Sequence, residues 1–244
     1  MTPGLTFCTS AMGRAMDVQN NLVRSMTANP GAKFVLLNYS SLDHLDRWAK
    51  QALPLYIERG QLTYAIYWGA EYWQPSHARN VAAHLVETRL MCNLDADNFA
   101  PAGFDGWLLS QYSTGQKLLV SRKADSSYGR IAIDTELFRS LGGYNEAMTG
   151  YGWEDVDLEE RALASGIKAA VIPAEFLVCT EQSRAIKTEN YPPKDCNLQQ
   201  SNDRNQEISR ENLARKDLVA NRRLAPGAGI VQVNWSGFKV FAGF

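Results

Sequence analysis

The sequence predicts an α/β fold in which a mostly parallel central sheet is flanked by helices. Short β-like runs alternate with segments of helical periodicity along the first part of the chain, and this order is typical of a parallel sheet covered on both faces. A length of 244 residues fits one such domain with an appended tail. Polar side chains also follow several predicted strands, at the edge where open sheets bind ligands.

The first part of the chain is predicted to follow a strict alternation. In residues 15–26, apolar Ala15, Val18 and Leu22 recur at helical spacing, which indicates an amphipathic helix. The other boundaries follow from the same periodicity and from caps and prolines. The expected strands are residues 4–9, 32–40, 62–68 and a run ending at Asp95, and the expected helices are 15–26, 40–53 and 74–90, the second stopping near Pro54.

The rest of the chain is less regular, and its composition changes at Ser183. Before that point we expect helices at 106–112, 134–140 and 152–167, strands at 116–121 and 128–133, and a strand pair at 168–178. After it, polar residues predict a linker, an exposed helix near 202–221 and a closing strand at 229–241. We therefore expect a main domain of residues 1–182 and a polar helical C-terminal extension, residues 183–244, packed on it.

Charge and cysteine content exclude several classes of protein. The chain has 25 basic and 26 acidic residues, so it lacks the field that nonspecific nucleic-acid binding requires. Four scattered cysteines without a CxxC pair indicate buried thiols rather than a zinc site or disulfides. No apolar run approaches the roughly 18 residues of a membrane span, and no leader pattern is visible. These features predict a cytoplasmic protein without a transmembrane segment.

Two carboxylates follow a short apolar run at the predicted edge of the sheet. Asp95 and Asp97 come directly after residues 91–94 and could offer oxygen ligands to Mg²⁺ or Mn²⁺. Such an ion could neutralise a diphosphate and act as a Lewis acid on its leaving oxygen. An EF-hand loop is excluded because Ala100 occupies its glycine position. A surface turn also explains this D-x-D pattern when it is taken alone.

A second cluster, TGYGWEDVDLEE at residues 149–160, combines glycines, aromatic residues and acids. Gly150 and Gly152 permit a close approach of the backbone to a ligand, and Tyr151 and Trp153 offer flat apolar faces suited to a sugar ring. The segment therefore has the composition of a carbohydrate-binding loop.

Two acids in this segment, Glu154 and Asp155, open a predicted helix. The N-terminus of a helix stabilises ionised carboxylates, so we expect both to be deprotonated and one to be available as a general base. Capping acids at an ordinary charged helix start are the alternative interpretation.

These clusters, in this order on this framework, resemble GT-A fold glycosyltransferases, most closely the family 2 enzymes and the related β-1,4-galactosyltransferases. The resemblance covers roughly residues 4–181. NLDADN is similar to the metal-binding strand end of the family, SHARNVAA to the Ala-Arg-Asn helix before it, and GGYNEAMTGYGWEDVDL to the segment that supplies the acceptor site and base. It implies that residues 1–182 form a GT-A catalytic domain.

The resemblance also implies a donor site. Arg79 would face the diphosphate or the base of the nucleotide. The family often has an acid near Asn38, which this chain lacks, so recognition of the base differs here. The residues that would line the uridine pocket are Thr9, Ser10, Arg14, Asn38 and Tyr39.

By the same resemblance, Asp97 would bind Mn²⁺ or Mg²⁺, and Asp95 would contact the ribose or the metal. Many relatives add a histidine from a later strand, but all 3 histidines of this chain precede Asp95. Water, Glu175 or Glu181 could replace that ligand, or the enzyme could work without a metal.

The implied reaction is transfer of a hexose, namely Gal, GalNAc or Glc, from a UDP-sugar to an acceptor hydroxyl. Asp155, favoured over Glu154, would deprotonate the hydroxyl, while Trp153 and Glu154 would hold donor or acceptor sugar. A single base implies inversion. The acceptor is open: a glycan, lipid-linked sugar, peptide, nucleic acid or small molecule. The oligomeric state is also open.

Two other functions remain as alternatives. A sugar nucleotidyltransferase normally has a glycine-rich basic loop after the first strand, whereas residues 8–17 hold one Gly and one Arg. A catalytically silent module that binds sugar nucleotides or glycans would not need a base at Asp155.

Overall fold

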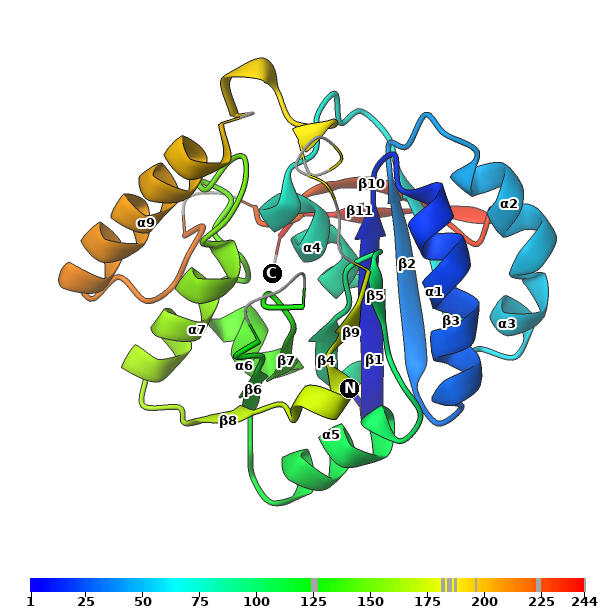
Figure 1. Cartoon of the computed structure of the whole chain (residues 1–244), viewed down its shortest axis with the longest axis horizontal. Helices are drawn as coiled ribbons and strands as arrows, with labels where there is room; N and C mark the ends of the chain where they lie inside the picture. Colours follow the sequence, from blue (N-terminus) through cyan, green and yellow to red (C-terminus); the bar gives the residue numbers. More distant parts are fainter. Residues whose placement is uncertain are drawn as a thin grey trace.

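The computed structural model describes residues 1–123, 127–180, 183, 186, 188–195, 197–222 and 225–243. Its centre is a nine-stranded sheet with strand order β11-β10-β3-β2-β1-β4-β7-β6-β8 (Figure 1). The strands of this sheet are β1 (Thr2–Ala11), β2 (Lys33–Tyr39), β3 (Leu62–Tyr67), β4 (Thr88–Asn93), β6 (Leu118–Val120), β7 (Ile131–Asp134), β8 (Ala169–Val171), β10 (Gly229–Val233) and β11 (Gly237–Phe241).

Strand direction confirms the predicted mostly parallel sheet. The four central strands β3, β2, β1 and β4 are parallel, and only β7 and β10 run against the common direction of the described strands in this sheet. Cys8 of β1 pairs with Asn93 of β4, so the residues that follow each strand emerge together at one edge. Ser10 and Asp95 are consequently neighbours at the carboxyl end of the sheet, as expected for a ligand-binding edge.

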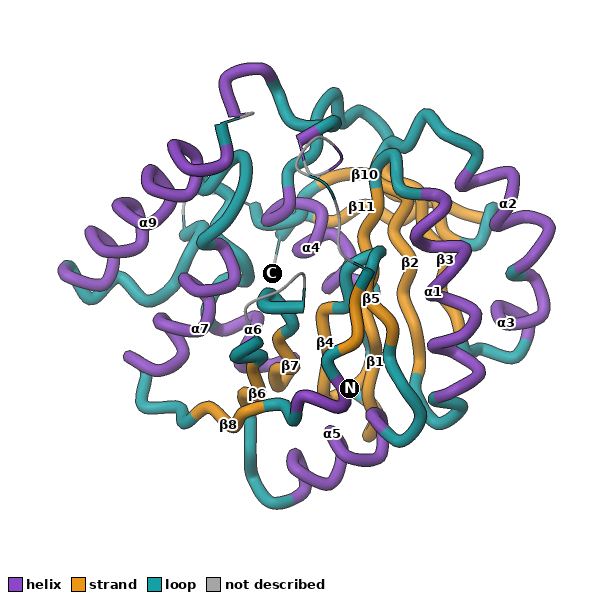
Figure 2. The backbone as a smooth tube through the Cα atoms, viewed as in Figure 1, coloured by secondary structure: helices purple, strands orange, loops and turns teal. Residues whose placement is uncertain are grey.

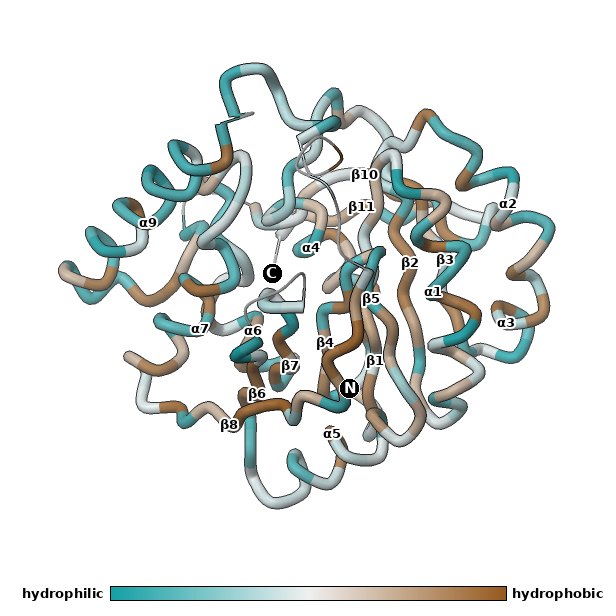
Figure 3. Tube along the Cα trace, viewed as in Figure 1, coloured by the Kyte–Doolittle hydropathy of each residue, from teal (hydrophilic) through white to brown (hydrophobic). Residues whose placement is uncertain are grey.

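Helices cover both faces of the sheet, as Figure 2 shows. One apolar cluster lies between the sheet and α1 (Ala15–Ala28), α2 (Leu45–Ala52), α3 (Pro54–Glu58) and α5 (Phe104–Ser113). The other lies beneath α4 (Pro75–His84), α6 (Thr135–Ser140) and α7 (Glu154–Ala164). Phe7 and Cys8 of β1 face opposite clusters because successive strand residues point to opposite sides. Several strands of the sheet are accordingly brown, the hydrophobic colour, in Figure 3.

The polar C-terminal segment, residues 183–244, contacts the rest of the fold at two distant places. Helix α9 (Leu198–Ala214) contacts α7, and the two lie side by side in Figure 1. The chain then returns to the opposite edge of the sheet, where β10 pairs with β3 and with β11. Residues 234–236 connect the two strands of this hairpin, and Asn234 and Trp235, which both have positive φ, are the central residues of a turn closed by the bond from the Ser236 amide to the Val233 carbonyl at 3.1 Å.

Several local expectations differ from the structure for identifiable reasons. The second helix ends at Ala52, near Pro54 as expected, but it begins only at Leu45, and Pro54 opens an additional helix, α3, because proline fits the first position of a helix. The segment expected to be helical to residue 90 leaves the helix at His84, and β4 begins at Thr88. The expected closing strand is a hairpin, because its NWSG stretch forms a turn.

The remaining elements are short. Strands β5 (Asn98–Phe99) and β9 (Val178–Cys179) form a separate two-stranded sheet, and single 3-10 turns cover Ala174–Phe176 and Pro193–Asp195. Among the described residues, no helix has the length and apolar character needed to cross a bilayer. Cys8 and Cys92 are buried free thiols and Cys179 is a partly exposed one, whereas Cys196 lies outside the described residues.

Candidate active site

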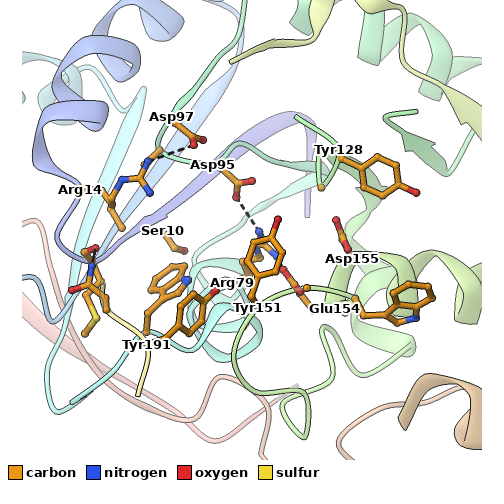
Figure 4. Close-up of a pocket in the computed structure, with 18 of the residues that line it drawn as sticks. Ser10, Arg14, Arg79, Asp95, Asp97, Tyr128, Tyr151, Glu154, Asp155 and Tyr191 are labelled. Carbon is orange, nitrogen blue, oxygen red and sulfur yellow. Dashed lines mark hydrogen bonds and ion pairs between the residues drawn. The ribbon is translucent and has the colours of Figure 1, made fainter. Parts of the chain in front are cut away.

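A cavity of about 480 Å³ opens at the carboxyl edge of the central sheet (Figure 4). Loops after β1 and β4, helix α4 and the start of α7 each contribute to its wall. The residues proposed from sequence that line it are Ser10, Arg14, Arg79, Asp95, Asp97, Trp153, Glu154 and Asp155. The two acidic clusters, about 60 positions apart in the sequence, therefore share one cavity.

Asp95 and Asp97 occupy the loop between β4 and β5. The carboxylate of Asp97 accepts hydrogen bonds from Asn98 Nδ2 at 2.8 Å and from Arg14 at 3.4 Å. Burial and the charge of Asp95 raise the pKa of Asp97 to about 6, although Arg14 opposes this shift. Arg130 fixes the orientation of Asn98, because its guanidinium donates a hydrogen bond to Asn98 Oδ1 at 2.6 Å. The carboxylates of Asp95 and Asp97 thus lie in a region where an added positive charge is favourable.

Arg79 of α4 joins the two acidic clusters. Its guanidinium donates to Asp95 Oδ1 at 3.0 Å and to Glu154 Oε1 at 2.6 Å, and Figure 4 shows it between them. Burial disfavours its charge, but Asp95 and Glu154 outweigh that effect and raise the pKa of Arg79 well above its usual value. Arg79 also lies over the Tyr144 ring, 5.3 Å from its centroid. A fixed cation therefore stands at the centre of the site.

Glu154 and Asp155 differ although they are adjacent at the start of α7. Glu154 is buried and uses one oxygen for Arg79, while its Oε2 has no hydrogen-bond partner among the described residues. Asp155 is partly exposed to the cavity and accepts a hydrogen bond from the Val156 amide at 2.8 Å. Buried polar atoms normally have partners, so the free Glu154 oxygen and the similarly unpartnered Trp153 Nε1 mark a place for a polar ligand.

The protonation of Asp155 corrects the sequence-based expectation. Burial and the neighbouring charge of Glu154 raise the pKa of Asp155 to about 7, against the effect of Arg79. The carboxyl is therefore only partly ionised at neutral pH, because these two effects exceed the stabilisation by the helix N-terminus.

The loop before α7 has an unusual backbone. Gly150, Gly152 and Trp153 all have positive φ, with values of 74°, 89° and 71°. Glycine adopts this region freely, but for a residue with a Cβ it costs about 1–2 kcal/mol. Trp153 precedes the first residue of α7, so the strained position lies directly beside the two acids.

Three of the proposed donor-site residues lie outside the cavity lining. Thr9 donates to the Leu94 carbonyl at 2.7 Å, and the Asn38 amide bonds the Tyr64 hydroxyl at 3.1 Å. Tyr39 stacks on Tyr67 and its hydroxyl lies 2.8 Å from a His77 ring nitrogen. The polar groups of these three side chains already have partners within the protein, so the side chains stabilise the edge of the sheet.

The cavity also contains residues that the sequence did not single out. Asn190 ties two loops together: its side chain donates to the Met12 carbonyl at 2.9 Å, and its carbonyl accepts from the Trp73 amide at 2.7 Å. These additional lining residues come from polar or irregular segments with no periodicity, so only the tertiary structure shows that they belong to the cavity. The added lining residues with polar or aromatic side chains are Trp73, Tyr128, Asn190, Tyr191 and Asn202, whereas Tyr151, which the sequence analysis named, also lines the cavity.

A protein-only metal centre is not present among the described residues, where no group of three His, Cys, Asp or Glu is arranged around one point. Glu175, one of the expected substitutes for a histidine ligand, is exposed and does not line the cavity. Glu181 lies outside the described residues. Asp95 and Asp97 alone fit an ion whose other ligands come from a bound diphosphate and water.

Comparisons with known proteins identify the fold. Residues 122–186 match a family model described as the N-terminal domain of galactosyltransferase, and this range includes Glu154 and Asp155. The structure of TarS residues 1–349 from S. aureus superposes with a TM-score of 0.61 at 10% identity, over 81% of this chain and 69% of that one. The chain has the GT-A glycosyltransferase fold.

Two other GT-A structures extend the comparison. A mannosyltransferase from Pyrobaculum calidifontis, in complex with GDP-Man and Mn²⁺, matches with a TM-score of 0.59 and 14% identity, over 89% of this chain and 76% of that one. The catalytic domain of Drosophila β1,4-galactosyltransferase 7, in complex with xylobiose, matches with a TM-score of 0.56 and 12% identity, over 86% and 80%. No curated protein sequence gives a significant match.

Proposed function

We propose that this GT-A protein is an inverting glycosyltransferase that transfers a hexose, Gal, GalNAc or Glc, from a UDP-sugar to an acceptor hydroxyl with assistance from a divalent metal. The observation that carries the proposal is the meeting of Asp95 and Asp97 with Glu154 and Asp155 in one cavity, with Arg79 between them. One acidic pair suits the diphosphate side of a donor, and the other suits activation of an acceptor.

Asp155 is the better candidate for the base. Its carboxylate faces the cavity, and its pKa of about 7 lies near neutral pH, where a general base is most effective. Glu154 is engaged by Arg79, so in this proposal it fixes that cation and offers its second oxygen to a sugar hydroxyl. Trp153 would supply an apolar face to the same sugar.

In the donor half, Asp95 and Asp97 would hold Mn²⁺ or Mg²⁺, which when bound supplies Lewis-acid assistance to the departing diphosphate. Arg14 and Arg79 carry the nearest positive charges and would orient the phosphates. Ser10 lines the cavity from the end of β1 and would contact the nucleoside. The Mn²⁺ and GDP-Man of the mannosyltransferase structure support a metal and a nucleotide-sugar, and the galactosyltransferase family match supports a UDP-sugar.

Calorimetric titration of UDP and of GDP, each with and without Mn²⁺, tests the donor half. We expect UDP to bind, with affinity that rises when Mn²⁺ is present. Preference for GDP would replace the UDP assignment, and failure of both nucleotides to bind would contradict the proposed donor site.

A screen of UDP-Gal, UDP-GalNAc and UDP-Glc for donor hydrolysis tests the catalytic half, because water can substitute for an unknown acceptor. The anomeric configuration of a product formed on an acceptor tests inversion. Tight binding of a donor with neither hydrolysis nor transfer, across a panel of sugar, lipid and peptide acceptors, would favour a silent binding module.

A further inference from the structure

Helix α9 buries an unusual face. A helix that packs on a domain normally buries an apolar stripe. The buried residues of α9 are instead Ser201, Asn205 and Ser209, which follow one another at intervals of four residues and form a polar stripe on one side. The helix is also largely hydrophilic in Figure 3. Hydrogen bonds rather than apolar packing must therefore define where this helix sits.

The first two residues of this stripe bond the backbone of the loop that leads into α7. Ser201 Oγ accepts from the Tyr151 amide at 2.7 Å and lies within 3.3 Å of the Thr149 carbonyl. Asn205 Nδ2 donates to the Gly152 carbonyl at 2.8 Å and to the Thr149 carbonyl at 3.2 Å. Both side chains thus hold the loop from one side, immediately before the acids.

The loop fits against α9 so closely that positions 150 and 152 have no room for a Cβ unless neighbouring side chains shift. A Cβ at Gly150 would lie 2.3 Å from Ser201 Oγ, and one at Gly152 would lie 2.4 Å from Asn202 Oδ1. Trp153 meanwhile holds a left-handed conformation that its Cβ disfavours. Such a backbone persists only where the surroundings determine it, and α9 supplies those surroundings.

We propose that Ser201 and Asn205 are positioning residues for catalysis, which hold the Thr149–Trp153 loop so that Asp155 points into the cavity. This inference rests on the proposed function, because it assigns a role relative to the proposed base. It makes the C-terminal segment part of the catalytic apparatus, although Ser201 and Asn205 themselves need not contact substrate.

The chain offers a matched control within the same stripe. Ser209 is as buried as Ser201, but its hydroxyl bonds Glu160 at 3.2 Å, in the second half of α7. Ser201→Ala and Ser209→Ala therefore remove the same group from the same face of the same helix. Only the first removes a contact with the loop.

We expect Ser201→Ala to lower kcat for donor hydrolysis about tenfold, since small displacements of reacting groups have large effects, with the Kd for UDP unchanged. Asn205→Ala, which removes two bonds to the loop, should have a larger effect of the same kind. Ser209→Ala should change kcat less than about twofold, although its effect on the melting temperature should be similar. Equal losses of kcat in Ser201→Ala and Ser209→Ala, or no loss in Ser201→Ala and Asn205→Ala, would overturn the proposal.

Hydrogen exchange separates this inference from the proposed function. The Tyr151 amide donates to Ser201, so its exchange should quicken in Ser201→Ala and stay slow in Ser209→Ala, whether or not the protein is active. If the wild-type chain neither hydrolyses a nucleotide-sugar nor transfers its sugar, the proposed function fails, and the exchange data still decide whether α9 holds the loop. Unchanged exchange in Ser201→Ala would refute that contact.

Discussion

The two acidic pairs of the cavity rest on different supports. Asp95 and Asp97 follow β4, a central strand with neighbours on both sides, and the loop they occupy is held by Asn98 and Arg130. Glu154 and Asp155 follow a loop with three positive φ values, which takes its hydrogen bonds from a helix more than 40 positions later in the chain. The position of Asp95 and Asp97 is thus fixed by the sheet, whereas that of Glu154 and Asp155 depends on hydrogen bonds from α9, which lies outside the sheet.

This difference suggests a division of labour. A site that binds the constant part of a donor gains from a rigid sheet edge, because the diphosphate and its metal need fixed geometry. A base carried on a loop can be aimed by contacts made elsewhere, so the acceptor side can vary without disturbing the sheet. The predictions below test each half separately.

Asp155→Asn should have the largest effect. The variant keeps the size of the side chain and its contact with the Val156 amide but cannot accept a proton, so kcat for transfer should fall by roughly 100- to 10,000-fold. The Kd for UDP should stay within about twofold, because the donor half is untouched. Full activity in this variant would show that the base lies elsewhere, and Glu154→Gln would then be measured next.

Asp97→Asn should act on the donor half instead. We expect the affinity for UDP in the presence of Mn²⁺ to fall by at least about tenfold, since an amide is a poorer ligand for a hard cation than a carboxylate. Without Mn²⁺ the two proteins should bind UDP almost equally. A calorimetric titration series in Mn²⁺ measures both quantities, and equal metal dependence in the wild type and the variant would exclude Asp97 as a ligand.

The pH dependence of kcat/KM for donor hydrolysis should report Asp155. A general base works in its deprotonated form, and the pKa of Asp155 in the ligand-free protein is raised to about 7, so kcat/KM should increase with pH through that value. Between pH 6 and pH 8 the expected rise is roughly tenfold. Donor concentrations below KM are needed for this profile. A flat profile over that range in an otherwise active enzyme would contradict the assignment.

The contrast between the acidic pair at the sheet edge and the pair held by α9 also explains which parts of the site could be predicted from the sequence. Short apolar runs that alternate with helical patterns in one continuous segment predict the central strands and place Asp95 and Asp97 at their carboxyl edge, because parallel strands end together. Asn190 has no such signal, since its side chain joins the cavity through a hydrogen bond to the Met12 carbonyl in a distant loop. Asn202 has none either, since it lines the cavity from α9, outside the segment that carries the pattern. Asn38 illustrates the opposite error: it lies at a strand end, but its amide is used by Tyr64.

Lys216→Gly should give the smallest effect and sharpen the interpretation of strain. Lys216 follows the C-terminus of α9 with φ 56°, and the bonds from its amide to Leu213 and from Asp217 to Asn212, both 2.9 Å, form the Schellman arrangement that favours glycine. Its side chain is exposed, so relief of strain should stabilise the fold by about 0.5–1 kcal/mol, or a few degrees in Tm, with kcat unchanged.

Trp153→Gly makes the corresponding change in the catalytic loop. It relieves the same kind of backbone strain but removes an indole that lines the cavity, so kcat should fall whatever the melting temperature does. Thermal melts and rates on both variants separate the two cases. Lys216, at the end of α9, should be replaceable by glycine without loss of kcat. Trp153, beside Glu154 and Asp155, should not, because its side chain lines the cavity. Equal kcat in the two glycine variants would contradict this difference.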